Sequence, residues 1–178
     1  MPSAPAVEAR RSVILPDLLR PDLRVVFCGT AAGTASARAG AYYAGRGNRF
    51  WSILHDTNLT PRRLDPHEFE QLVEFGIGLT DVCKTRHGMD REIGTDAFDP
   101  AGLAAALAKI HAPTIAFNGK AAARAALELG SGSPLAYGPA GLQVGGADAW
   151  VLPSTSGAAS GSWDPAPWHD LAASLPSS

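Results

Sequence analysis

Short β-branched apolar runs alternate along the chain with longer segments whose apolar residues have helical spacing. The short runs predict buried strands at residues 23–28, 76–80, 114–117 and 149–152. Capping residues and apolar spacing predict helices at residues 49–56, 66–75, 99–110, 120–129 and 165–173. Strands that alternate with helices indicate an α/β fold with an open, mostly parallel central sheet and helices on both faces.

The length of 178 residues suits one domain with a full hydrophobic core. Apolar residues make up 46% of the chain and charged residues 18%, which is typical of a globular protein rather than a disordered one. The first residues are rich in Pro, Ala and Arg. We therefore predict a disordered tail at residues 1–13 and a single domain at residues 14–175.

The sequence predicts a cytoplasmic protein. No apolar run approaches the roughly 20 residues that a membrane span needs, and the two N-terminal arginines are not followed by the apolar core of a secretory signal. Cys28 and Cys83 form no C-x-x-C pair. We interpret them as two buried thiols in a reducing compartment.

The net charge gives only weak information about partners. A formal charge of −2 argues mildly against nucleic acid, since phosphate binding favours a basic surface. The distribution is uneven, however, because acidic residues dominate positions 65–74. Several basic residues flank the glycine-rich loops, namely Arg38, Arg46, Arg49, Lys84, Arg86 and Lys120. A locally basic face on a neutral body is therefore compatible with the sequence.

Two loops of small residues follow predicted strands, GTAAGTAS at 29–36 and PSTSGAASG at 153–161. Ligands of open α/β sheets bind beyond these carboxyl ends of the strands. The first loop has neither the lysine and glycine spacing of a P-loop nor the G-x-G-x-x-G fingerprint of dinucleotide binding. The second lacks the G-x-S-x-G elbow. The 5 histidines are scattered singly, so we predict no metal ion and no cofactor.

An aromatic, glycine-rich segment, AYYAGRGNRFW, lies between these two loops at residues 41–51. An aromatic side chain in such a loop can stack on a nucleic-acid base. The alternative is that Tyr42 and Tyr43 cover the edge of the core. Phe50 and Trp51 are expected in the core, since both lie on a predicted helix.

Several motifs together resemble the mismatch-specific uracil-DNA glycosylase and thymine-DNA glycosylase family. They are the strand VVFCG with a G-x-x-x-G turn, the aromatic loop followed by NRFW, the strand GIGLTD, and WVLPSTSG. The resemblance extends from about Asp17 to the final helix. It implies an enzyme of base excision repair that flips uracil, or thymine, out of DNA and hydrolyses its N-glycosidic bond to leave an abasic site.

The resemblance also implies roles for individual residues. The family places a water-positioning asparagine where this chain has Ala31, whose side chain cannot orient water. The aromatic that stacks on the flipped base corresponds to Tyr43, and backbone groups of Thr30 and Tyr43 would address the pyrimidine edge. The residue that wedges into the vacated space corresponds to Ala158, which is much smaller than the usual leucine.

Cleavage of the bond develops positive charge on the sugar and negative charge on the base, so a carboxylate or amide is needed near the sugar. Asp81 closes a predicted buried strand at the ligand edge of the sheet. We predict that Asp81 orients or deprotonates the water, with capping of the turn as the alternative, and that Asn118 is the fallback water ligand. We attribute Asp90, Asp96 and Asp99 to capping and solvation.

Further residues are predicted to contact DNA, namely Ser36, Arg46, Lys84, Lys120, Ser156, Gly157, Ala158 and Ser160. For Lys84 and Lys120 the alternative is a solvated surface lysine. No lysine is suitably placed to form a Schiff base with the sugar, so we expect hydrolysis without strand cleavage. The expected partner of this monomer is double-stranded DNA with G·U or similar mispairs, in which flipping costs least, with single-stranded DNA as a second form.

Two other functions remain compatible with the sequence. Ala31 and Ala158 would suit a catalytically weak or inactive module of the same fold that only binds DNA mispairs. A small-molecule N-ribosyl hydrolase is the third reading. It would cleave free deoxyuridine, and its affinity would depend on neither duplex DNA nor salt.

Overall fold

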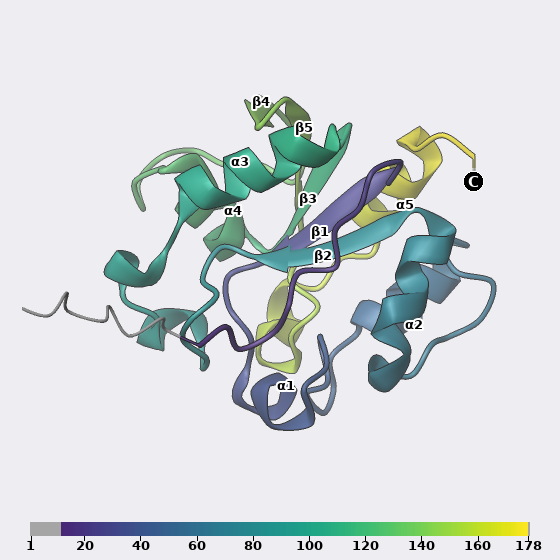
Figure 1. Cartoon of the computed structure of the whole chain (residues 1–178), viewed down its shortest axis with the longest axis horizontal. Coiled ribbons are helices and arrows are strands. Elements are labelled where there is room, and N and C mark those ends of the chain that lie inside the picture. Colours follow the sequence, from purple (N-terminus) through teal and green to yellow (C-terminus); the bar gives the residue numbers. More distant parts are fainter. Residues whose placement is uncertain (1–11, 178) are drawn as a thin grey trace, which may run out of the picture.

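The computed structural model describes residues 12–177 and is built around a five-stranded sheet with the order β2-β1-β3-β5-β4 (Figure 1). The strands are β1 Val25–Gly29, β2 Ile77–Asp81, β3 Thr114–Asn118, β4 Gly138–Val144 and β5 Ala147–Leu152. β1 pairs in parallel with β2 and β3, and β3 pairs in parallel with β5, whereas β4 is antiparallel to β5. The predicted α/β fold with an open, mostly parallel sheet is therefore confirmed.

Helices cover both faces of this sheet (Figure 1). The α-helices are α1 Thr34–Ala39, α2 Phe50–Asp56, α3 Pro100–Ile110, α4 Lys120–Leu127 and α5 Ala166–Ser174, and the 3-10 helices are η1 Pro66–Phe75, η2 Asp90–Glu92, η3 Thr95–Ala97 and η4 Gly157–Ser162. Neighbouring side chains of a strand point to opposite faces. Accordingly, Phe27 of β1 packs with α2 and α5, and Val26 packs with α3 and α4.

The sequence prediction lacked strand β4, helix α1 and the three short 3-10 helices η2, η3 and η4. β4 contains Gly138, Pro139 and Gly141, which have low strand propensity, and it forms because its backbone pairs with β5. Helix α1 lies in a Gly/Ala segment that has no apolar period. The predicted strands and the other predicted helices are present, with shifts of bounds at their ends.

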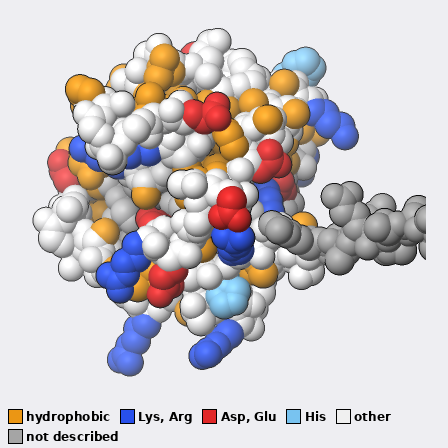
Figure 2. All heavy atoms as spheres, turned by 90° about the vertical axis from the view of Figure 1, so that its left-hand side faces the viewer, with side chains coloured by type: hydrophobic (Ala, Val, Ile, Leu, Met, Phe, Trp, Pro, Cys, Tyr) orange, Lys and Arg blue, Asp and Glu red, His pale blue; other side chains and the backbone are white. Residues whose placement is uncertain are grey.

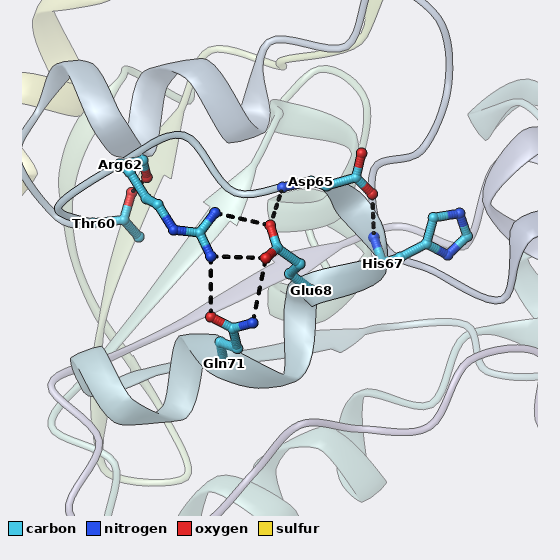
Figure 3. A network of polar contacts seen from close by, with 6 residues as sticks. All are labelled: Thr60, Arg62, Asp65, His67, Glu68 and Gln71. Atoms are coloured by element: carbon cyan, nitrogen blue, oxygen red, sulfur yellow. Dashed lines mark hydrogen bonds and ion pairs between the residues drawn. The ribbon is translucent and has the colours of Figure 1, made fainter.

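Helix η1 has the predicted bounds, but it is a 3-10 helix. The Asp65 carboxylate accepts a hydrogen bond from the His67 amide at 3.0 Å, and the Glu68 carboxylate accepts one from the Asp65 amide at 2.8 Å. Arg62 donates to both carboxylate oxygens of Glu68, at 2.7 and 3.0 Å (Figure 3). This reciprocal cap fixes the start of η1 within the acidic segment 65–74.

The first part of the described chain runs beside β2. Leu18 forms an antiparallel bridge with Leu79, and the Ile14 amide donates to the Lys84 carbonyl at 2.8 Å. Most of the predicted tail, residues 1–11, lies outside the described residues. Within residues 12–177 no helix is long and apolar enough to cross a membrane.

Trp168 of α5 links the core to the loop that follows β5. Its side chain is fully buried and stacks on Phe27 of β1, with ring centroids 5.4 Å apart. Its Nε1–H donates to the carbonyl of Pro153 at 3.0 Å. One side chain therefore holds together the central strand, the last helix and the start of the second small-residue loop.

We expect Trp168→Ala to lower the free energy of unfolding by roughly 3–5 kcal/mol, because it leaves a large cavity. Trp168→Phe should cost about 1–3 kcal/mol, since it retains most of the packing but leaves the Pro153 carbonyl without its donor. Urea denaturation measures both values. The matched control is Trp163→Ala, which removes a partly exposed tryptophan of the same cluster. Equal losses at the two tryptophans would contradict the anchoring role of Trp168.

Candidate active site

The loops after β1, β2, β3 and β5 surround a cavity of about 610 Å³ at the carboxyl edge of the sheet. The floor lies where β1 and β3 are neighbours, because residues 29–31 and 118–120 both line it. The chain passes from β1 to β2 on one side and then to β3 on the other. Such a switch point is where open α/β sheets bind their ligands.

Tyr43 forms an aromatic wall of this cavity. Its backbone has a φ of 52°, a left-handed conformation that is uncommon for aromatic residues. Its ring packs on Phe50 of α2 with centroids 4.1 Å apart, and the Phe50 amide donates to Asn48 Oδ1 at 2.9 Å. One face of Tyr43 is thus supported by the core.

The hydroxyl of Tyr43 is buried and makes no hydrogen bond within residues 12–177. Burial raises the pKa of Tyr43 well above its usual value, and the charge of Asp81 raises it further, while the nearby Asn118 side chain partly opposes the shift. Tyr43 is therefore a neutral phenol, able to donate one hydrogen bond.

Asn118, at the end of β3, also lines the cavity and is held by Thr155. Its Oδ1 accepts from the Thr155 amide at 2.9 Å, and its Nδ2 donates to Thr155 Oγ1 at 2.9 Å. Thr155 is fully buried, so the amide orientation is fixed. One hydrogen on Nδ2 and one lone pair on Oδ1 remain available to a ligand. The sequence did not indicate Thr155, because the pair depends on the register of β3 and β5.

Asp81 lies behind the floor of the cavity rather than in its lining, and it is 6% exposed. In the strand register it is opposite Gly29. A Cβ atom at position 29 would lie 2.6 Å from Asp81 Oδ1 and 3.3 Å from Tyr43 Oη, so only glycine allows both groups this close. Desolvation raises the pKa of Asp81 to about 7, against the opposing charge of Lys84.

Asp90 is the carboxylate that lines the cavity, at the start of η2. The residue as a whole is exposed, yet desolvation of its carboxyl group raises its pKa, while the Thr30 side chain opposes the shift. The sequence predicted capping and solvation as the roles of Asp90, whereas the N-cap of η2 is Met89. No sequence spacing could reveal this position, since an isolated bridge between Ala32 and His87 brings the loop to the cavity.

Only some of the predicted DNA-binding residues line the cavity. Lys120, Ser156 and Ala158 line the cavity, as do the predicted pocket residues Thr30 and Ala31. Lys120 Nζ lies 4.5 Å from the centre of the Tyr137 ring.

Gly157 lies outside the lining and packs against the backbone of Arg46, since a Cβ at position 157 would be 3.4 Å from the Arg46 carbonyl. Arg46 and Ser160 are exposed and also lie outside the lining. These residues therefore belong to the surface around the cavity.

Two of the predicted DNA-binding residues have internal partners instead. Ser36 is buried, and its hydroxyl accepts from the Ala44 amide at 3.1 Å, which supports the loop before Asn48. Lys84 pairs with Asp17 and with the hydroxyl of Thr80. On the face shown in Figure 2, which is the left-hand side of Figure 1, basic and acidic side chains are interspersed and no uniformly basic patch appears.

The residues present give no indication of a metal centre. Within residues 12–177, no three His, Cys, Asp or Glu side chains are grouped to hold a metal ion. Cys28 and Cys83 are buried free thiols, and burial raises the pKa of Cys28 well above its usual value. The polar groups that a ligand in the cavity meets are therefore amides, hydroxyls, Lys120, Arg91 and the carboxylate of Asp90.

Comparison with known proteins agrees with this geometry. Residues 16–172 match the family model of the uracil DNA glycosylase superfamily. The fold is similar to that of a provisionally assigned uracil DNA glycosylase from Methanosarcina acetivorans, solved in solution by NMR, with a TM-score of 0.63 and 24% identity over 89% of this chain and 94% of that chain. The chain therefore belongs to the uracil DNA glycosylase superfamily, a family of DNA-binding glycosidases that act in base excision repair.

Proposed function

We propose that this protein is a monofunctional, mismatch-directed uracil-DNA glycosylase, with thymine opposite guanine as a second substrate. It takes the base out of the duplex into the cavity and hydrolyses its N-glycosidic bond. The observation that carries the proposal is the convergence of an aromatic ring, a fixed amide and a carboxylate, from Tyr43, Asn118 and Asp90, on one cavity. Family membership supports the class of reaction.

The cavity walls suit a flipped pyrimidine. Tyr43 supplies a flat surface that Phe50 supports from behind, and base–aromatic stacking contributes about 1–3 kcal/mol. Asn118 retains one donor and one acceptor, which match the N3–H and a carbonyl oxygen of uracil. Its two hydrogen bonds with Thr155 keep this amide in one orientation.

Mispaired bases are the proposed substrates because of the cost of flipping. Extruding a base costs a few kcal/mol, least where pairing is already weak, as in G·U and G·T. Single-stranded DNA avoids most of this cost and is a second substrate form. The cavity requires an extruded base in either case, because its floor lies at the strand ends between four loops.

The reaction breaks the bond between C1′ and the base nitrogen, with the electron pair leaving on the base. A water oxygen adds to C1′ and loses a proton. We assign the carboxylate that stabilises the cationic sugar and accepts this proton to Asp90, because it lines the cavity. Ala31 offers only a methyl group there. Asp81, which the sequence favoured, is the second candidate, because it adjoins the lining residue Gly29 but is itself outside the lining. Lys120 lies over Tyr137, which is consistent with hydrolysis rather than Schiff-base chemistry.

Substitution of the two carboxylates tests this assignment. We expect Asp90→Asn to slow release of uracil from a G·U duplex by roughly 10²–10⁴-fold, as for loss of a general base. Asp81→Asn should retain activity within about tenfold, because its side chain is outside the lining. Single-turnover kinetics measure both rates.

The matched control for this pair is Asp148→Asn, since Asp148 is exposed near the start of β5, accepts a hydrogen bond from Gln143 and lies outside the cavity lining. The reverse order of effects would assign the reaction to Asp81. Full activity in both variants would overturn both assignments. Tight binding of G·U duplex by the wild type without an abasic product would favour a mispair-binding module over an enzyme.

The raised pKa of Asp81 predicts a pH-dependent stability. The folded state binds this proton with a pKa of about 7, compared with an ordinary value of 3.8, so the contribution to stability is greatest below pH 3.8 and is lost as the pH rises through 7. The shift corresponds to on the order of 4 kcal/mol. The free energy of unfolding of Asp81→Asn, relative to wild type, should therefore increase steadily as the pH rises from 4 to 8.

Urea unfolding at several pH values measures this gain. The control is Asp56→Asn, whose side chain is 62% exposed and should show no such trend. A constant difference between Asp81→Asn and wild type across this pH range would show that Asp81 is not a desolvated carboxylate in the folded protein.

A further inference from the structure

Met89 stands out on the rim of the cavity because it is a large apolar side chain that remains 44% exposed. Within residues 12–177 the other large hydrophobic residues with comparable exposure are Val13, Tyr137 and Leu142. Met89 is the one among these four that lines the cavity. Its exposure by itself is ordinary for a surface residue. Its position at the rim of the candidate active site, however, places an apolar side chain where bound DNA would lie and could bury it.

The backbone on both sides of Met89 is held firmly. The Gly88 amide donates to the Ala32 carbonyl at 3.0 Å, which attaches the loop to the floor of the cavity. The Met89 amide donates to Glu92 Oε2 at 2.8 Å, and the Met89 carbonyl accepts from the Glu92 amide at 2.8 Å. A Cβ at position 88 would lie 2.6 Å from that Glu92 oxygen, so glycine is needed for this arrangement. The exposed thioether thus projects from a fixed backbone.

Extrusion of a base leaves a gap in the duplex. Proteins that distort duplex DNA insert apolar side chains, methionine among them, between neighbouring base pairs. Ala158, on the loop after β5, lines the same cavity, but its methyl group is too small to fill a base-sized space. Met89 lies on the loop after β2 and is the direct neighbour of Asp90. The side chain that fills the gap would therefore adjoin the carboxylate that faces the sugar.

We propose that Met89 enters the base stack of duplex DNA and fills the space of the extruded nucleotide, in place of the small Ala158. The proposal rests on the proposed function as far as extrusion of uracil is concerned. Met89 makes this contribution only in duplex DNA, because single-stranded DNA has no stack to be held open. Its flexible, polarizable side chain adapts to the irregular gap between two base pairs.

Excision from duplex and from single-stranded DNA tests this role. We expect Met89→Ala to slow uracil release from a G·U duplex by roughly 10–100-fold, since flipping costs a few kcal/mol, and to leave the rate on single-stranded DNA within about twofold of wild type. Met89→Leu should retain most of the duplex rate. Leu142→Ala is the matched control, because Leu142 is 47% exposed and lies outside the cavity lining. An unchanged duplex rate, or equal losses on both DNA forms, would overturn the proposal.

A binding measurement separates this proposal from the proposed function. The probe is a duplex with a tetrahydrofuran abasic site opposite guanine and the fluorescent base 2-aminopurine beside that site. Wild type and Met89→Leu should change the 2-aminopurine fluorescence on binding, whereas Met89→Ala should not. This change in a protein that releases no uracil would support the wedge and refute the glycosylase. An identical change with Met89→Ala would refute the wedge alone.

Discussion

The site depends on one buried residue, Thr155, which connects three parts of the fold. Its amide and hydroxyl both bond the Asn118 side chain, which fixes the end of β3 against the loop after β5. Its carbonyl accepts from the Arg49 amide at 2.9 Å, directly before α2. Helix α2 in turn carries Phe50, the support for the Tyr43 ring. The aromatic wall and the amide are therefore held by one set of hydrogen bonds.

The second constraint on the site is electrostatic. Asp81 is desolvated behind Gly29, where its charge raises the pKa values of Tyr43 and Cys28. Asp90 is at the cavity surface and can meet water directly. The two carboxylates thus differ in environment, although Asp81 ends β2 and Asp90 lies only nine residues further along the chain. A buried carboxylate that is half protonated near pH 7 affects the stability of the fold, whereas a cavity-lining carboxylate is suited to act on a bound substrate.

The cavity also explains how a protein with a net charge of −2 can bind DNA. On the face shown in Figure 2, basic and acidic side chains are interleaved, so phosphate contacts there would give only modest affinity. Recognition would then rely on the cavity itself, through stacking, the fixed amide and an apolar side chain at the rim. Such contacts form only after the base has been extruded. They therefore suit a protein that selects bases which leave the helix readily.

The sequence by itself determined four of the five strands, most α-helices and the edge of the sheet at which the site lies, because apolar periodicity, caps and glycines are local properties. It also indicated Asn118, which directly follows a predicted strand, and Tyr43, through its aromatic segment and the family resemblance. Tertiary structure alone decided which carboxylate faces the cavity. Asp81 is adjacent to Gly29 in the register of β1 and β2, and Asp90 reaches the cavity through the bridge between Ala32 and His87. Strand β4 and the role of Thr155 likewise depend on pairing between distant segments, which no local pattern encodes.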